Sequence, residues 1–147
     1  MRRKSLSGVA CPIARTLDVI GDWWSMLIIR EALFGSRRFG EFQKTLGLAK
    51  NILTVRLRAL VDQGILKMAP ASDGSAYQEY RLTDKGRSLY PVLISLALWG
   101  QDNAPTSGPK SQLVDREHGR PVRSVNVIAS DGRVLKAGET KMVRGAG

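Results

Sequence analysis

LAKNILTVRLRALVDQGIL, residues 48–66, has the periodicity of a helix with one buried face. Leu53, Leu57, Leu60 and Val61 recur at the i, i+4, i+7 and i+8 positions of an apolar stripe. No acidic residue occurs from Leu48 to Val61. The positions opposite the stripe are Asn51, Thr54, Val55 and Arg58. A face with an amide, a hydroxyl, methyl groups and a guanidinium but no carboxylate suits an anionic partner.

The charge of the whole chain indicates the same kind of partner. The 147 residues include 23 Lys and Arg against 13 Asp and Glu, a net charge of +10. Residues 1–100 carry 15 basic against 8 acidic residues, so the excess is not confined to a tail. We expect nucleic acid, an acidic membrane surface or an acidic protein as the partner.

The sequence predicts a cytoplasmic protein that does not span a membrane. No apolar run approaches the roughly 18 residues that a transmembrane helix needs. The N-terminus, MRRKSLSGVAC, resembles a secretion or lipoprotein signal, but its apolar core is short and Gly8 replaces the leucine-like residue of a lipid-attachment box. We interpret it as a basic arm. The single cysteine agrees with a reducing compartment.

The order of predicted elements is that of a winged helix-turn-helix, mainly α with a small β-hairpin wing. Helices are expected at 12–20, 22–35, 37–47, 49–63 and 83–100, and strands at 65–69 and 77–83. Asp22 is a predicted N-cap, and Gly35, Gly47 and Gly64 end helices. Pro91 predicts a kink or break in the last helix.

We expect three regions along the chain. Residues 1–100 form the winged helix domain for DNA binding and dimerisation, 101–116 form a linker, and 117–147 form a β-rich extension. The sequence of the extension predicts a β-hairpin that turns at 130–132. Its apolar side consists of Val125, Val127, Ile128, Val134 and Leu135. This side is expected to pack on its own domain, on a partner subunit or on an effector pocket.

The second helix of a helix-turn-helix enters the major groove of duplex DNA. Asn can pair with adenine, Arg with guanine, and the methyl groups of Thr and Val with that of thymine. Asn51, Thr54, Val55 and Arg58 are therefore the base-reading candidates. The phosphate candidates are Arg37, Arg38, Lys44, Lys50, Lys67 and Arg81. Arg56 lies nearer the buried stripe, where it braces the fold or meets a phosphate.

Two other interpretations of this face remain open. It can be a solvated face of a basic protein, or it can bind RNA or another protein without operator specificity. RNA has a deep, narrow major groove that does not admit a reading helix, so competition between duplex DNA and duplex RNA separates these cases.

Several motifs together resemble the HxlR-type winged helix regulators, relatives of the MarR group. They are C-P, D-x-I-G-x-W, R-F-x-E, L-x-x-R-L and E-Y-x-L-T-x-K-G, within about residues 10–100. The resemblance implies a bacterial transcription regulator that binds operators as a homodimer. Ala49 departs from the Ser or Thr N-cap usual there, and the wing tip has Asp73 and no Arg.

A single module of this kind reads few base pairs, so we expect a two-fold dimer on an inverted repeat. The expected interface is the apolar faces of helices 12–20 and 89–99. Its candidate residues are Ile13, Leu17, Leu89, Val92, Leu93, Leu96 and Trp99.

Cys11 is the one residue with potential chemistry. It precedes Pro12, so it is predicted at a helix N-cap, where a thiolate is stabilised. The resemblance implies oxidant or electrophile sensing in some family members with a cysteine at the corresponding place. The alternative is a small, partly buried residue at a dimer contact.

Nothing in the sequence predicts catalysis, a metal site or a cofactor. His118 is the only histidine and lies far along the chain from Cys11, and one Cys with one His cannot supply the four ligands of structural zinc. The glycines are explained by helix ends and do not form a phosphate loop. A small-molecule effector is left open, without a predicted identity.

Overall fold

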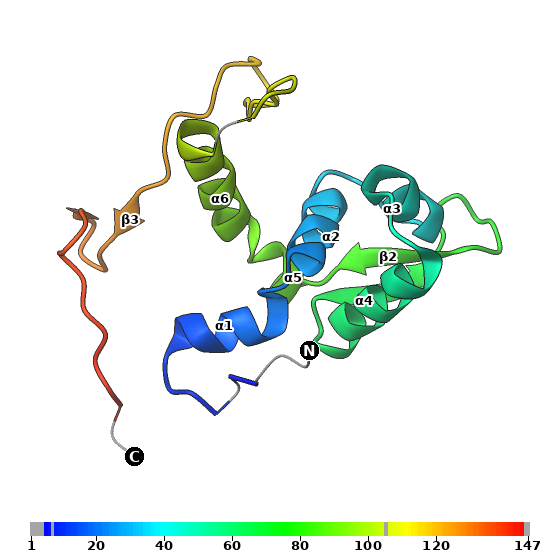
Figure 1. Ribbon diagram of the computed structural model, residues 1–147, viewed down its shortest axis with the longest axis horizontal. Helices are drawn as coiled ribbons and strands as arrows, with labels where there is room; N and C mark the ends of the chain where they lie inside the picture. The colour runs from blue at the N-terminus through cyan, green and yellow to red at the C-terminus, as the bar shows by residue number, and fades with distance from the viewer. Residues whose placement is uncertain (1–4, 7, 105, 146–147) are drawn as a thin grey trace. The chain divides into compact units, whose positions relative to one another are not determined.

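The computed structural model describes residues 5–6, 8–104 and 106–145 (Figure 1). The predicted basic arm at 2–4 lies outside these residues. The chain divides into two compact units, Met1–Tyr90 and Pro91–Gly147, which we describe separately. The first unit contains α1 (Pro12–Ile20), α2 (Trp23–Leu33), α3 (Phe39–Leu46), α4 (Lys50–Asp62), β1 (Leu66–Pro70), β2 (Gln78–Leu82) and α5 (Asp84–Arg87). This order confirms the predicted winged helix-turn-helix.

The ends of the helices follow local backbone chemistry. Asp22 caps α2, because its carboxylate accepts hydrogen bonds from the backbone N–H of Ser25 (2.9 Å) and from the hydroxyl of Ser25 (2.7 Å). Gly47 adopts the left-handed region at φ +66°, which ends α3 and turns the chain toward α4. Ala49 is the N-cap of α4 and provides no side-chain hydrogen bond. All three positions agree with the sequence prediction.

The core of the first unit forms around α2. Leu53, Leu57 and Leu60 of α4 are buried, as the stripe predicted, together with Ile28 and Ile29 of α2. The helix α2 contacts α1, α3, α4 and β2. It is therefore the central core helix, and it holds the outward face of α4 in a fixed orientation.

The wing is the antiparallel hairpin of β1 and β2, with Leu66 opposite Leu82 and Pro70 opposite Gln78. After β2, Thr83 caps α5 by accepting a hydrogen bond from the backbone N–H of Gly86 at 3.0 Å. Gly86 is buried, and a Cβ at this position would lie 2.3 Å from the carbonyl oxygen of Ile65. The close approach of α5 to the start of β1 therefore requires glycine.

The predicted helix at 83–100 is broken, as Pro91 indicated. The structure has α5 and a separate α6 (Tyr90–Asn103), with Pro91 at the second position of α6. In the first turn of a helix the missing N–H of proline leaves no hydrogen bond unmade. Among the described residues, no helix is long and apolar enough to cross a bilayer.

Beyond α6, the second unit contains the short antiparallel strands β3 (Val127–Ile128) and β4 (Val134–Leu135). Gly132 in their turn has φ +93°, and the backbone N–H of Ala129 donates to the carbonyl of Arg133 at 2.8 Å. The predicted hairpin is confirmed. The side chains of Val127, Ile128 and Val134 are exposed.

Candidate nucleic-acid interface

The outward face of α4 presents the four residues predicted to read bases. Asn51, Val55 and Arg58 are exposed, and the side chain of Thr54 is half-buried. The hydroxyl of Thr54 donates to the carbonyl of Lys50 at 2.7 Å, so its methyl group remains for a partner. The first acidic residue of α4 is Asp62, the last residue of the helix. This face offers hydrogen-bond donors and methyl groups without a repelling carboxylate.

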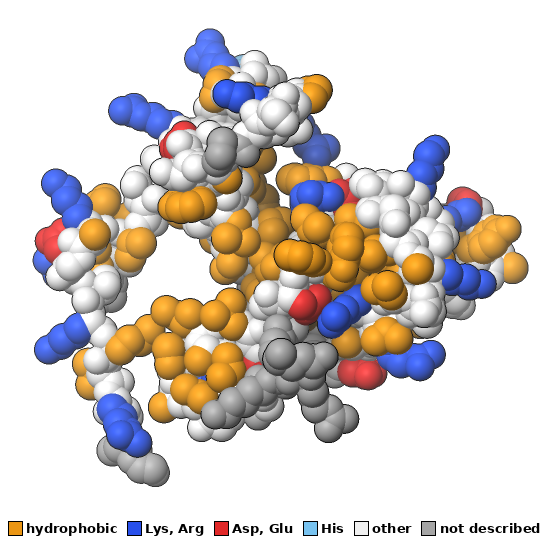
Figure 2. All heavy atoms as spheres, in the orientation of Figure 1, with side chains coloured by type: hydrophobic (Ala, Val, Ile, Leu, Met, Phe, Trp, Pro, Cys, Tyr) orange, Lys and Arg blue, Asp and Glu red, His pale blue; other side chains and the backbone are white. Residues whose placement is uncertain are grey.

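Exposed cations surround this face on the neighbouring elements. Lys50 begins α4, Lys44 lies on α3, Lys67 on β1, and Arg37 just before α3. None of these four side chains forms an ion pair with another described residue. Figure 2 shows Lys and Arg side chains around the region of α3, α4 and the wing. These four cations are available to an anionic partner.

Arg81, another predicted phosphate contact, is engaged inside the wing. Its guanidinium donates to the carboxylate of Glu79 at 3.0 and 3.2 Å. Glu79 is only 4% exposed and also accepts from the backbone N–H and the hydroxyl of Ser72. The pKa of Glu79 is lowered, first by the Ser72 N–H and then by Arg81. Arg81 therefore neutralises a buried carboxylate, and its guanidinium is less available to a phosphate than that of an unpaired arginine.

Arg38 is held in the same way by the wing tip, which we define as residues 71–77. Its Nη2 lies 2.5 Å from the carboxylate of Asp73 and 3.3 Å from the hydroxyl of Ser75. Its guanidinium also lies over the ring of Tyr77, 5.0 Å from the centroid. The pKa of Asp73 falls from 3.8 to about 2, chiefly because of the Ser75 N–H, with a smaller contribution from Arg38.

Sequence reasoning missed this contact and also missed Glu41. The Glu41 carboxylate accepts hydrogen bonds from the backbone N–H groups of Arg37 (3.1 Å) and Arg38 (2.9 Å), which lowers its pKa. It thereby fixes the start of α3. The spacing R-F-x-E contained the signal, because a Glu three residues after an N-cap is typical of a capping box.

Arg56 braces the fold, which was one of its two predicted roles. Its Nη1 lies 3.6 Å from the carboxylate of Asp22, the residue that caps α2. The ion pair joins α4 to the start of the central helix. Arg56 and Arg58 are two residues apart on α4, yet only Arg58 is left for a partner molecule.

The residues predicted for a dimer interface are largely exposed. Ile13 and Leu17 on α1 are exposed, as are Val92, Leu96 and Trp99 on α6, with Trp99 at 66%. Leu89 and Leu93 are half-buried. Large apolar side chains at this exposure are typical of interaction surfaces.

Cys11 occupies the N-cap of α1, as predicted, and Pro12 follows at the first helical position. Its side chain is half-buried and its thiol is free. Its carbonyl accepts the backbone N–H of Arg15 at 3.1 Å, so the cysteine lies directly on the first turn of the helix.

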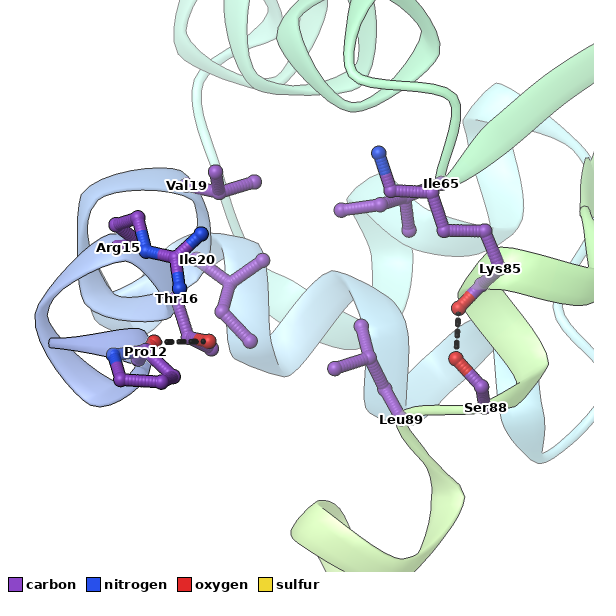
Figure 3. Close-up of a pocket in the computed structure, with 9 residues that line it drawn as sticks. All are labelled: Pro12, Arg15, Thr16, Val19, Ile20, Ile65, Lys85, Ser88 and Leu89. Atoms are coloured by element: carbon purple, nitrogen blue, oxygen red, sulfur yellow. Dashed lines mark hydrogen bonds between the residues drawn. The ribbon is translucent and has the colours of Figure 1, made fainter. Parts of the chain in front are cut away.

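An open cavity of about 460 Å³ lies between α1 and α5 (Figure 3). Its walls include apolar side chains of Val19, Ile20 and Leu89. The hydroxyl of Thr16 donates to Pro12, the hydroxyl of Ser88 to Lys85, and the Lys85 ammonium to Gln63. The two cations of this cavity, Arg15 and Lys85, have no ion pair with another described residue. The volume of the cavity is within the range of small-ligand sites.

Comparisons with known proteins agree with this geometry. Residues 19–107 match the sequence profile of the HxlR-like helix-turn-helix family. An HTH-type transcriptional regulator of Mycobacterium tuberculosis is 40% identical over 102 residues, which is 69% of this chain. The match spans 65% of the length of that mycobacterial relative.

Two solved structures are also similar. The transcription factor PA1607 is 52% identical with a TM-score of 0.85, over 95% of this chain and 98% of that chain. The redox regulator HypR in its oxidized form is 33% identical with a TM-score of 0.59, over 65% of this chain and 100% of that chain. The first similarity includes the second unit, and the second similarity covers about two thirds of the chain.

Proposed function

Since the chain belongs to the HxlR-like helix-turn-helix family of transcription regulators, and is not an enzyme, we propose that it binds one operator sequence as a homodimer. The observation that carries this proposal is the exposed, acid-free face of α4 on a rigid core. The operator is an inverted repeat in duplex DNA, and the protein acts in the cytoplasm.

In this proposal, Asn51, Thr54, Val55 and Arg58 read base edges in the major groove. Asn51 bonds adenine, Arg58 bonds guanine, and the methyl groups of Thr54 and Val55 meet thymine. The exposure of Asn51, Val55 and Arg58, and the position of all four residues opposite the buried stripe, support these roles.

We assign six cations to the phosphates, and they differ in whether an ion pair within the protein already engages them. Arg37, Lys44, Lys50 and Lys67 are exposed and without a described ion pair, so they neutralise phosphates directly. Arg38 and Arg81 are each paired with a carboxylate of the wing. They contribute less to the charge that DNA meets.

The dimer forms through the apolar faces of α1 and α6, which places two α4 helices on successive major grooves. The residues that we assign to it are Ile13, Leu17, Leu89, Val92, Leu93, Leu96 and Trp99. Residues 1–100 then form the DNA-binding and dimerisation domain, 101–116 a linker, and 117–147 an extension.

Cys11 is the residue through which oxidants or electrophiles would change DNA binding. HypR, similar over about two thirds of the chain, is a redox regulator. The helix N-cap position of Cys11 supports the same role here. Operator binding is measured for the wild type and for Cys11→Ser, each before and after peroxide treatment. Peroxide should alter binding by the wild type and not by the variant. Equal binding by all four samples would make Cys11 structural. We assign the cavity between α1 and α5 as the candidate site for a small-molecule effector, because its volume is within the range of small-ligand sites.

The experiment that tests this proposal is a competition between duplexes. Labelled DNA from the region flanking the gene is bound by the full chain and then challenged with unlabelled duplex DNA or duplex RNA of the same sequence. DNA should compete strongly and RNA weakly, because the A-form major groove excludes α4. Equal competition would favour the alternative, a basic winged helix that binds RNA or protein without operator specificity.

A further inference from the structure

Three side chains of the wing tip converge on one guanidinium at the start of α3. Arg38 is 2.5 Å from Asp73, 3.3 Å from Ser75, and lies over the ring of Tyr77. The planar guanidinium can donate along its edge and stack with its face at the same time. A lysine ammonium at this position would keep the charge but lose this combination.

The wing tip is itself a folded turn, so Arg38 holds more than one side chain. The backbone N–H of Ser75 donates to the carboxylate of Asp73 at 2.9 Å, and that of Gly74 to the carbonyl of Ala71 at 3.1 Å. The N–H of Ala71 donates to the carbonyl of Tyr77 at 3.0 Å. Fixing Asp73 therefore fixes the whole turn.

A backbone contact next to Arg38 connects the same two elements. The N–H of Tyr80 on β2 donates to the carbonyl of Arg37 at 2.7 Å. The neighbouring Arg37 has an exposed side chain and no described ion pair. Two adjacent arginines thus differ: one faces solvent, and the other is bound by the wing.

We propose that Arg38 is a positioning residue that clips the wing tip to the start of α3, so that the wing is already placed when DNA arrives. Asp73 is the acceptor of this clip and not a repulsive residue of the DNA-binding surface. The inference rests on the proposed function, because it assigns a role to the wing in DNA binding.

The direction in which DNA affinity changes when Asp73 is removed distinguishes the clip from simple electrostatics. Removing a carboxylate from a surface that meets a polyanion should tighten binding. If Asp73 holds the wing in place, removing it should instead weaken binding, because the loosened wing must be ordered again when DNA binds. Arg38→Lys keeps the net charge and should weaken binding for the same reason.

The test measures operator affinity of the full chain by gel shift at one salt concentration. We expect Arg38→Lys and Asp73→Ala each to bind about 5-fold more weakly, and the double variant no more weakly than either one. The matched controls are Arg133→Lys, which changes an arginine paired with Asp131 near the turn between β3 and β4 and should bind like the wild type, and Asp62→Ala, which should bind equally or more tightly. Tighter binding by Asp73→Ala, or equal affinities of Arg38→Lys and Arg133→Lys, would overturn the clip.

Amide hydrogen exchange of residues 71–77 in the free protein keeps the inference testable without an operator. Both clip variants should exchange faster there, while the core of α4 around Leu57 keeps its protection. Unchanged exchange in the wing tip would contradict the clip even if DNA binding were intact. A wild type that binds no DNA, with faster exchange in the variants, would refute the proposed function and leave the clip standing.

Discussion

Neighbouring side chains of one type have different roles because their partners differ. Arg56 contacts Asp22 at 3.6 Å and braces α4, whereas Arg58 is exposed on the outward face. Arg38 is bound to Asp73, whereas Arg37 is exposed. At the residue scale, the free cations and not the total charge decide what the surface can bind.

Replacing a base-reading residue should change sequence preference. We expect Arg58→Ala and Asn51→Ala to relax the preference at one position of each half-site, with a cost of about 1–3 kcal/mol against the preferred base. Each side chain is exposed and has no described ion pair or side-chain hydrogen bond to lose. Gel shifts with single-base operator variants measure the effect.

The control is Lys50→Ala, which removes a cation assigned to a phosphate. This change should weaken binding to all sequences alike and reduce the salt dependence by about one phosphate contact. If Arg58→Ala behaved like Lys50→Ala, Arg58 would not read a base.

The wing tip should respond to acid. The folded-state pKa of Asp73 is about 2, below its usual 3.8. The contribution of its carboxylate to the free energy of unfolding is therefore present above about pH 4 and is lost as pH falls toward 2. The lowered pKa of Glu79 acts in the same direction. Carboxyl-carbon NMR titration should place the Asp73 midpoint clearly below 3.8. Ser75→Ala keeps the backbone N–H but removes the hydroxyl, the second cause of the lowered pKa, and should raise the midpoint in part. A wild-type midpoint at the ordinary value would rule out these hydrogen bonds.

The packing of α5 against the chain before β1 involves one close backbone approach. A Cβ at Gly86 would lie 2.3 Å from the carbonyl oxygen of Ile65 and 2.9 Å from a methyl group of Leu82. We expect Gly86→Ala to lower the free energy of unfolding by about 1–3 kcal/mol, because the backbone must shift to make room. Thermal and denaturant unfolding measure this change.

The matched control is Gly40→Ala in α3, where a Cβ would meet no atom within 4 Å. This change should stabilise the protein by about 0.5–1 kcal/mol, because alanine loses less backbone entropy in a helix. A similar loss of stability in both variants would show that the contact of Gly86 with Ile65 is not the cause.

The elements could largely be predicted from the sequence because their signals are local. The stripe of Leu53, Leu57 and Leu60, the cap Asp22 and the break before Pro91 each depend on residues within a few positions. The contact of Arg38 with Asp73 joins residues 35 positions apart and depends on how the wing folds back. No local pattern contains that information, so the partition into free and engaged arginines required the structure.

At the scale of the whole molecule, we expect dimerisation and salt to control affinity together. The exposed apolar residues of α1 and α6 should form a dimer at micromolar concentration, which light scattering measures. Replacing the exposed Trp99 and Leu96 by polar residues should shift the protein toward monomer and weaken operator binding. A wild-type monomer at micromolar concentration would contradict the dimer.

The four exposed cations assigned to phosphates without a described ion pair, Arg37, Lys44, Lys50 and Lys67, predict a steep salt dependence. A dimer doubles their number, so the affinity should fall by several powers of ten across a modest range of salt concentration. Binding isotherms at several concentrations of KCl measure the slope. An affinity that does not change with salt would mean that these cations do not meet phosphates.

The central claim, that paired α4 helices read duplex DNA, is tested most directly by footprinting the full chain on DNA that flanks its own gene. The account predicts two protected half-sites of an inverted repeat, with centres about 10 base pairs apart, one helical turn. Methylation of guanines in the major groove of these half-sites should interfere with binding. Protection without a defined site, or protection that major-groove methylation does not disturb, would contradict the claim.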